Sequence, residues 1–297
     1  MTPRLIVITG PTASGKSAIA VEVARRLSCE IISADSRQIF REIPIGTAAP
    51  TPEEMAAVPH HFVGIKNLDE YYSAACFESD VLSLLPQLWQ RSPYAVMCGG
   101  SMMYVDAVCR GIDDLPEISV ENRRRATEIF DRGGLQQLRL ELLELDPVYY
   151  RQVDLNNHKR LIHAIEIIYQ SGKPYSQLRT GAIRQRPFRI MKFAVDMPRE
   201  TLFDRINRRV DKMIADGLEQ EARAVYSRRH LNSLNTVGYK ELFAMFDGLI
   251  DRPAAIARIA KNTRVYAKKQ LTWLKRDPQI TWLKPDGAAD AILSECQ

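Results

Sequence analysis

Eight consecutive residues near the start of the sequence constrain its fold most strongly. The run GPTASGKS follows an apolar strand-like segment, Leu5–Thr9, and precedes a helical stretch, Ser17–Leu27. This is the G-x4-G-K-S pattern in the context expected for a phosphate-binding loop. Backbone N–H groups in such a loop, at a helix N-terminus, bind anions, with Lys16 neutralising charge and the Ser17 hydroxyl suited to Mg²⁺. The predicted phosphate- or nucleotide-binding residues are Gly10, Pro11, Thr12, Ala13, Ser14, Gly15, Lys16 and Ser17.

Strand-like and helix-like segments alternate after this loop. Strands are expected at Glu30–Asp35 and Pro93–Cys98, with a helix at Tyr72–Gln90 between them, and a returning strand at Arg189–Asp196. This order predicts an α/β fold with a parallel sheet. Residues 115–187 are helical and polar in character. We therefore expect a P-loop three-layer parallel-sheet core at 1–114 and 188–297, with an inserted all-helical domain at 115–187.

Two long helices are predicted in the C-terminal third, at Thr201–Arg229 and Pro253–Arg276. On the first of them, residues 202, 206, 210 and 213 form an apolar stripe at helical spacing. Ala49–Val58 is interpreted as a connection, and Asp196 as the N-cap of the helix that follows it. The tyrosine pairs at 71–72 and 149–150 are expected to pack in the core rather than stack on bases.

Composition excludes several classes of protein. Of the 297 residues, 45% are apolar and 26% charged, which is typical of a globular chain and excludes a disordered one. No apolar run approaches the roughly 18 residues of a membrane span, and the N-terminus runs directly into the first strand, so a cytoplasmic protein without a membrane partner is expected. Five cysteines without C-x-x-C spacing, and His60-His61 without nearby ligands, argue against structural zinc.

The positive charge gathers late in the chain. Residues 199–285 hold 18 Lys/Arg against 10 Asp/Glu, which suggests a polyanionic partner. Arg205, Arg209 and Lys212 recur on the first long helix. On the last helix, Lys261, Arg264, Lys268 and Lys275 share one face, with Lys269 and Arg276 nearby. Such a face fits RNA phosphates, although a merely solvated helix face is the alternative.

Two further groups are candidates for chemistry at the same edge of the sheet. Asp35 follows the second predicted strand, where open α/β sheets bind ligands, and its carboxylate could accept a proton from an acceptor group. A helix N-cap or an indirect role in Mg²⁺ binding is the alternative. The third strand ends in Gly99-Gly100-Ser101, which suits close approach to a ligand, or only a tight turn.

Taken together, these segments resemble the tRNA dimethylallyltransferases, also called tRNA isopentenyltransferases, of the bacterial type. The matching blocks are GPTASGKS (10–17), EIISADSRQIFREIPIGTAAP (30–50), HHF (60–62), YYSAACFESD (71–80), GGSMMYV (99–105), RINRRVDKMIADGLEQE (205–221), TVGYKE (236–241) and TRVYAKKQLTWLK (263–275). They occur in the family's order over most of the chain. Met102, Asn157 and His163 depart from the family's usual Gly, Asp and Arg.

The resemblance implies a reaction. Dimethylallyl diphosphate gives its five-carbon group to N6 of the adenosine immediately 3′ of the anticodon, position 37, and diphosphate leaves with the help of Mg²⁺. The partners implied are tRNA and dimethylallyl diphosphate, and a monomer is expected. The target base must leave the anticodon loop to reach a donor held by the phosphate loop.

The resemblance also assigns residues. Asp35 is the expected base, Ser101 lies at the reacting centre or contacts tRNA, and Lys16 and Arg209 bind the diphosphate, with Ser17 on the metal. The expected tRNA contacts are Asp35, Ser36, Arg37, Gln38, Ser101, Arg123, Lys159, Arg160, His163, Lys240, Arg264, Lys268 and Lys269.

Two other functions fit part of the sequence. A P-loop small-molecule kinase would use the same loop with ATP and would place Asp35 on an acceptor hydroxyl, but it leaves the basic last helix unexplained. A non-catalytic RNA-binding protein that uses a nucleotide as a switch would tolerate loss of Asp35.

Overall fold

The computed structural model describes residues 2–296. The chain divides into two compact units. The first joins Met1–Cys109 to Gln185–Gln297, and the second is Arg110–Arg184. The second unit thus begins at 110 where the sequence suggested 115, and ends at 184 where it suggested 187.

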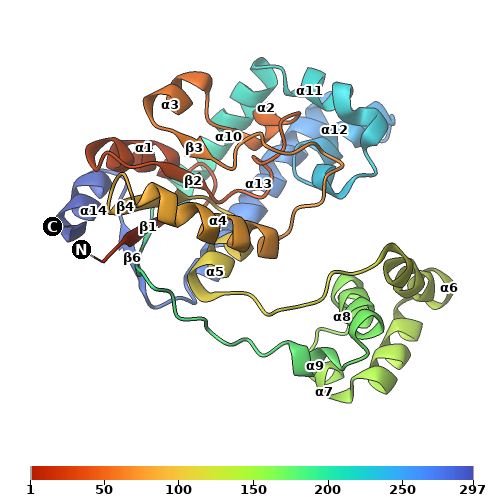
Figure 1. The fold of residues 1–297 in the computed structure, drawn as a ribbon. Helices are drawn as coiled ribbons and strands as arrows, with labels where there is room; N and C mark the ends of the chain where they lie inside the picture. Colours follow the sequence, from red (N-terminus) through yellow and green to blue (C-terminus); the bar gives the residue numbers. More distant parts are fainter. Residues whose placement is uncertain (1, 297) are drawn as a thin grey trace. The chain divides into compact units, whose positions relative to one another are not determined.

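The first unit is built on one parallel sheet (Figure 1). Its strands are β1 (Arg4–Thr9), β2 (Ile31–Ser33), β3 (His60–His61), β4 (Tyr94–Cys98), β5 (Arg189–Val195) and β6 (Ile280–Leu283), in the order β3-β2-β4-β1-β5-β6. Ile8 near the end of β1 pairs with Cys98 on one side and Phe193 on the other. Because all strands run the same way, the loops after β1, β2 and β4 lie at one edge, which confirms the predicted α/β class.

Alternate residues of the strands serve two different cores. The helices that cover the sheet are α1 (Lys16–Arg26), α4 (Ala74–Leu88), α5 (Met102–Arg110) and α14 (Ala288–Cys296). Ile6 and Ile8 pack with α1 and α14, whereas Leu5 and Val7 pack with α4 and α5. Successive side chains of a strand point to opposite faces, so a strand that is apolar throughout needs a helical layer on each side. The first unit therefore has three layers.

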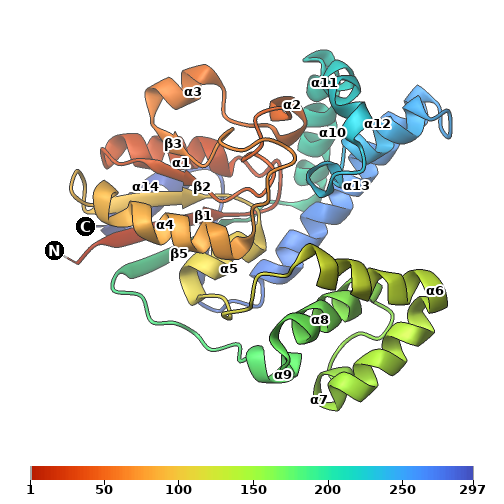
Figure 2. The same cartoon turned by 45° about the vertical axis from the view of Figure 1, so that its right-hand side comes forward.

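A further group of helices continues the first unit beyond the sheet edge (Figure 2). It consists of α2 (Pro44–Thr47), α10 (Arg199–Ala215), α11 (Leu218–Val225), α12 (Tyr239–Phe246), α13 (Arg252–Leu274) and the 3-10 turns Tyr226–Arg228 and Asn232–Leu234. Helix α3 (Pro52–Ala57) lies apart from this group, against α1. Leu202 and Ile206 on α10 pack against Ala267 on α13. The predicted apolar stripe is thus confirmed for α10, with Val210 also buried.

Several local predictions were wrong. The helix expected at 201–229 breaks at Gly217, whose φ of 105° no helix accommodates, so α10 and α11 are separate. The expected connection at 49–58 contains α3, which is stabilised by a capping box between Thr51 and Glu54. Asp196 does not cap α10, which begins after Pro198 without a side-chain cap. Tyr71 is 63% exposed rather than packed in the core.

The second unit has its own core, and every regular element in residues 110–184 is a helix. These are α6 (Val120–Leu145), α7 (Pro147–Tyr150), α8 (His158–Ser171) and α9 (Tyr175–Leu178). Leu142 on α6 and Leu161 on α8 are fully buried in it. Tyr149 is buried against the edge of the Tyr175 ring, as expected. Asn157 accepts a hydrogen bond from the Arg160 backbone N–H and so caps α8. In neither unit is any described helix long and apolar enough to cross a bilayer.

Candidate active site

The GPTASGKS run folds into the loop that its sequence predicts. Gly10 has a φ of 149° and Gly15 a φ of 92°, both in the region that favours glycine. A Cβ on Gly10 would lie 2.9 Å from Ser14 Oγ, so a larger residue would displace the loop. Gly15 precedes the first residue of α1, where the backbone N–H groups of the first turn point outward along the helix axis. The loop therefore has the backbone geometry of an anion site.

Lys16 supplies the positive charge of this loop. Its Nζ donates to the Pro11 carbonyl at 3.3 Å and forms no ion pair within residues 2–296. Burial lowers the pKa of Lys16, and Arg209 lowers it further, while Cys98 and Asp35 oppose this change. An ammonium group held among partly buried cations without a carboxylate partner is destabilised until an anion binds.

A cavity of about 460 Å³ lies in front of the loop, and we call it the Lys16 cavity. It is lined by Ala13, Gly15, Lys16, Ser17, Ala18, Glu54, Arg205, Arg208 and Arg209. Three of these are arginines of α10, and Arg205 donates to the Ser14 carbonyl at 3.3 Å. Four cations against one carboxylate make this cavity suited to a polyanion such as diphosphate.

Asp35 lies directly after β2 and is held by its own loop. Its Oδ1 accepts hydrogen bonds from the backbone N–H groups of Arg37, at 2.9 Å, and Gln38, at 3.3 Å. The carboxylate thus stabilises a turn, and it does not cap a helix, since the next helix begins only at Pro44. Its Oδ2 accepts no hydrogen bond from residues 2–296. One oxygen fixes the orientation of the carboxylate and the other stays available for a ligand.

The loop after β4 brings Ser101 into contact with Ser36, the residue that follows Asp35. Ser101 Oγ accepts from the Ser36 backbone N–H at 2.8 Å and lies 3.1 Å from the Ser36 hydroxyl. Gly99 passes so close to β2 that a Cβ would lie 2.1 Å from the Ala34 carbonyl oxygen. Gly99 is therefore required by the close approach of two backbone segments, whereas a Cβ on Gly100 would lie 2.3 Å from Nε2 of the Gln270 side chain. Ser101 joins the loops that follow β2 and β4.

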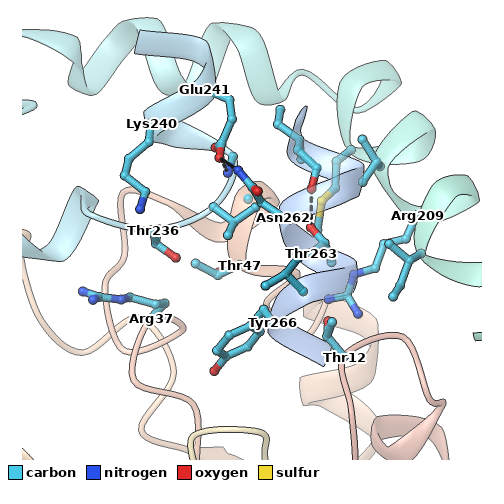
Figure 3. Close-up of a pocket in the computed structure, with 18 of the residues that line it drawn as sticks. Thr12, Arg37, Thr47, Arg209, Thr236, Lys240, Glu241, Asn262, Thr263 and Tyr266 are labelled. Atoms are coloured by element: carbon cyan, nitrogen blue, oxygen red, sulfur yellow. Dashed lines mark hydrogen bonds between the residues drawn. The ribbon is translucent and has the colours of Figure 1, made fainter. Parts of the chain in front are cut away.

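A second cavity, of about 540 Å³, opens beside these loops, and we call it the Asp35 cavity (Figure 3). It is lined by Thr12, Asp35, Ser36, Arg37, Gly46, Thr47, Ser101, Ile206, Arg209, Val210, Met213, Leu218, Asn235, Thr236, Val237, Gly238, Lys240, Glu241, Ile259, Asn262, Thr263, Val265, Tyr266 and Lys269. Arg37 and Lys240 lie on one side of it, Arg209 and Thr12 on the other, and Tyr266 between them. Its lining combines a set of aliphatic side chains with a larger set of polar and charged ones. Such a mixed lining suits an organic ligand that has both apolar surface and hydrogen-bonding groups.

Arg209 is the residue that lines both cavities. Burial lowers the pKa of Arg209, and Asp35 opposes this effect. Its guanidinium makes no hydrogen bond within the described part of the chain. Arg209 therefore has its donors free at the place where an anion in the Lys16 cavity would meet a ligand in the Asp35 cavity.

Gln270 is a buried side chain at the site that the sequence analysis did not single out. It lies on α13, is 2% exposed, and its Oε1 accepts from the Thr12 backbone N–H at 2.8 Å. Its Nε2 donates to the Gly100 carbonyl at 2.9 Å. One amide thus ties the phosphate loop and the loop after β4 to α13. Its place in the block TRVYAKKQLTWLK was visible, but nothing in that block shows which loops the side chain reaches.

The residues expected to contact tRNA near Asp35 have different surroundings. Arg37 donates to the backbone carbonyls of Asn232 and Ser233 and lines the Asp35 cavity. Burial lowers the pKa of Arg37, while Asp35, Tyr104 and Tyr266 oppose this. Gln38 is fully engaged inside the protein, since it accepts from Ser33 and donates to two carbonyls of the 47–48 segment. Its side chain supports the loop instead of facing a ligand.

Of the cations expected on the later helices, some line the Asp35 cavity and one is bonded to another side chain of the protein. Lys240 and Lys269 are exposed and line the Asp35 cavity, and Lys268 is exposed beside them. Arg264 donates to the Asn207 side chain at 2.7 Å and lies over the Phe203 ring. Arg264 thus has a structural contact of its own.

In the second unit, the four remaining expected tRNA contacts lie on α6 and α8. Arg123 and His163 both lie 3.8 Å from the carboxylate of Glu166. Lys159 and Arg160 are exposed at the start of α8. The structure therefore gathers Arg123 and His163 around one buried acid.

The fold and the two cavities together define a class of protein. The site combines a parallel α/β sheet, a phosphate loop after strand β1, and a second cavity that shares Arg209 with the Lys16 cavity. This combination is typical of an enzyme that binds a phosphorylated ligand beside a second substrate.

Comparison with known proteins identifies the family. Residues 38–277 match the family model for IPP transferase. A tRNA dimethylallyltransferase 2 of Parabacteroides distasonis is 54% identical over 282 residues, which are 95% of this chain and 94% of the relative. The solved full-length tRNA isopentenylpyrophosphate transferase of Bacillus halodurans is 35% identical with a TM-score of 0.70, covering 98% of this chain and 94% of that one. The chain belongs to the IPP transferase family.

A third comparison concerns the fold alone. A solved eukaryotic dimethylallyltransferase acting on tRNA has a TM-score of 0.80 with this chain at 23% identity, and the match covers 99% of this chain and 77% of that one. The architecture is therefore shared well beyond the bacterial relatives.

Proposed function

We propose that this protein transfers the dimethylallyl group from dimethylallyl diphosphate to N6 of the adenosine immediately 3′ of the anticodon in tRNA, and releases diphosphate. Membership of the IPP transferase family supports this reaction. The observation that carries it is the arrangement of the two cavities. An anion site and an organic-ligand site meet at the guanidinium of Arg209, which is what transfer from a diphosphate to a nucleobase requires.

The Lys16 cavity suits the leaving group. As the bond between C1 of the donor and its bridging oxygen breaks, negative charge grows on the diphosphate. Lys16 and Arg209 line the Lys16 cavity at the start of α1, so a diphosphate bound there would meet these cations and the N–H groups of the helix as its charge grows. Preorganised donors of this kind supply a large share of catalysis.

Asp35 suits the acceptor side. N6 of adenine forms the new bond to C1 and must lose one proton, which passes to the carboxylate. An exocyclic amine is a weak nucleophile, so a base within hydrogen-bond reach is needed. Asp35 fits because Oδ1 is fixed by the Arg37 and Gln38 N–H groups while Oδ2 faces no protein donor in residues 2–296.

The residues present also fit Mg²⁺. The described residues hold no cluster of three His, Cys, Asp or Glu that could enclose a metal. Mg²⁺ bound with a diphosphate needs few protein ligands, because phosphate oxygens and water complete its octahedron. The Ser17 hydroxyl, exposed in the Lys16 cavity, is the ligand that we assign to it. Bound there, the ion would neutralise part of the diphosphate charge.

The tRNA would place its target base in the Asp35 cavity, extruded from the anticodon loop. Lys240, Lys268 and Lys269 offer phosphate contacts at its rim. Arg123, Lys159, Arg160 and His163 would add contacts from the second unit. We further propose that the protein acts in the cytoplasm as a monomer.

The kinase interpretation is not favoured, since the full-length relatives are named as transferases acting on tRNA. The nucleotide-switch interpretation gives no reason for the free oxygen of Asp35.

Mass spectrometry tests the proposal directly. An unmodified tRNA anticodon stem-loop is incubated with the protein, Mg²⁺ and dimethylallyl diphosphate. We expect a gain of one five-carbon unit on the adenosine next to the anticodon. ATP binding without any gain would favour the kinase.

A further inference from the structure

A pair of side chains on the wall of the Asp35 cavity has no role in the reaction described above. Asn262 on α13 and Glu241 on α12 both line this cavity and are hydrogen-bonded to each other (Figure 3). Neither is placed at the phosphate loop. An amide that faces a ligand cavity can read a base edge, because it carries both a donor and an acceptor.

Glu241 fixes which end of the amide faces the cavity. Its Oε1 accepts from Asn262 Nδ2 at 2.7 Å, and its Oε2 accepts from the Gly238 backbone N–H at 2.8 Å. Both oxygens therefore act as acceptors, so the nitrogen of Asn262 must face Glu241. Glu241 is 6% exposed and lies in the first turn of α12, which leaves its side chain little freedom to move. Asn262 Oδ1 is consequently left as an acceptor, and it accepts no hydrogen bond within residues 2–296.

The position of Asn262 along α13 relates it to the reacting groups. Tyr266 lies four residues further on, one helical turn away on the same face, and also lines the cavity. Burial and the Asp35 carboxylate raise the pKa of Tyr266 to about 12. Gln270, one more turn along, is bonded to the phosphate loop. Along α13, therefore, Gln270 contacts the phosphate loop, Tyr266 lies near Asp35, and Asn262 lies one turn beyond Tyr266.

From this geometry we infer that Asn262, oriented by Glu241, is a specificity-determining residue that accepts a hydrogen bond from the 6-amino group of the extruded adenosine. This inference rests on the proposed function. The amino group has two protons, so one can be held by Asn262 Oδ1 while the other is available to Asp35. The remaining Nδ2 proton of Asn262 can reach N7, which gives the pairing that asparagine makes with adenine. A base with an oxygen at C6 would present an acceptor to an acceptor.

Inosine is the probe that isolates this contact, because it replaces the 6-amino group of adenosine by oxygen. Equilibrium binding of the full-length protein to two anticodon stem-loops, with adenosine or inosine at the target position, is measured without donor. The quantity of interest is the ratio of the two dissociation constants. We expect Asn262→Ala to lower the preference for adenosine about fivefold to tenfold, since a bidentate contact is removed.

Glu241→Gln sharpens the test. A glutamine can donate to Asn262 Oδ1, so the amide of Asn262 is free to turn its nitrogen toward the cavity. We expect the preference for adenosine to fall by a similar factor, with inosine binding more tightly than it binds to the unchanged protein. Asn67→Ala, an exposed asparagine outside the cavity, is the matched control and should leave the ratio unchanged.

An equal loss of affinity for both stem-loops in Asn262→Ala would overturn the inference, because a purely structural role weakens both alike. Should Glu241→Gln fail to fold, the Asn262→Ala ratio still decides the matter. Failure of the proposed function would be seen elsewhere, as absence of prenylation by the unchanged protein.

Discussion

The Lys16 cavity and the Asp35 cavity touch at Arg209, yet the chain builds them in different ways. Most of the Lys16 cavity comes from one run of residues, 13–18, at the start of α1, and three arginines of α10 complete its positive charge. The Asp35 cavity takes its wall from segments spread between residues 12 and 269, and its polar groups are mainly side chains.

The difference follows from the kind of ligand that each cavity is proposed to bind. A phosphate group looks the same in every donor, so the backbone of one loop and a few nearby cations are enough to bind it. A nucleobase is recognised by a particular set of donors and acceptors, which must come from several directions. Changes in the Lys16 cavity should therefore affect the donor, and changes in the Asp35 cavity should affect the acceptor.

The largest effect is expected at the reacting end of the Asp35 cavity. In Asp35→Asn, the amide oxygen can still accept from the Arg37 and Gln38 N–H groups, so the loop should keep its shape. The base is lost, and we expect kcat for prenylation to fall about a thousandfold while tRNA affinity changes little. Single-turnover kinetics and stem-loop binding measure the two. Turnover near that of the unchanged protein would remove Asp35 from the mechanism.

Next in size is the change in the Lys16 cavity. In Lys16→Met, a cation that faces the leaving diphosphate is lost, and we expect kcat/KM for the donor to fall about a hundredfold with stem-loop affinity retained. The donor dependence of initial rates shows this. Unchanged donor kinetics would contradict the phosphate-loop assignment.

The pH dependence of donor binding follows from the same lysine. Burial lowers the pKa of Lys16 below its ordinary 10.5, so it loses its charge at a lower pH than an exposed lysine. Donor affinity should therefore decline as pH rises through that lowered pKa, which lies below 10.5. In Lys16→Arg the charge persists, so the alkaline decline should disappear from a titration of inorganic diphosphate binding. A decline of equal size in Lys16→Arg would assign it to another group.

A smaller effect is expected at Gln270, which is hydrogen-bonded to the phosphate loop and to the loop after β4. Gln270→Met fills a similar volume but leaves the Thr12 N–H and the Gly100 carbonyl without their partner. Each buried unpaired group costs about 1–3 kcal/mol, so the melting temperature should fall and both donor and acceptor parameters should worsen, by about tenfold in kcat/KM. Gln87→Met, exposed on α4, is the control. An effect on the donor alone would show that Gln270 supports only one cavity.

The smallest effect concerns the rim of the Asp35 cavity. Lys268→Gln combined with Lys269→Gln removes two exposed charges. If both contact phosphates, the slope of log affinity for the stem-loop against log salt should become shallower by about 1.4, with donor KM unchanged. Lys284→Gln, exposed after β6, should leave the slope as it is. An unaltered slope in the double variant would mean that this face is only solvated.

The sequence predicted the parts of the site that depend on neighbours in the chain. The phosphate loop, the Asp35 segment and the Gly-Gly-Ser turn each follow a strand, and parallel strands must end at a common edge. Short elements were missed, such as β3 and β6, because two to four residues carry no readable periodicity. The break between α10 and α11 was missed because apolar spacing continues on both sides of Gly217.

The order of residues along the chain was enough to predict an α/β protein with a phosphate loop, a carboxylate at the end of a neighbouring strand, and a basic C-terminal third. Other features depend on tertiary contacts that no local pattern shows. Arg209 lines both cavities, Gln270 links the phosphate loop and the loop after β4 to α13, and the side-chain amide of Gln38 is hydrogen-bonded inside the protein. The hydrogen bond between Glu241 and Asn262, 21 residues apart along the chain, is a further example. The reason is physical. Backbone geometry is set by residues next to one another, whereas the partner of a polar side chain is whatever group folding brings within about 3 Å of it.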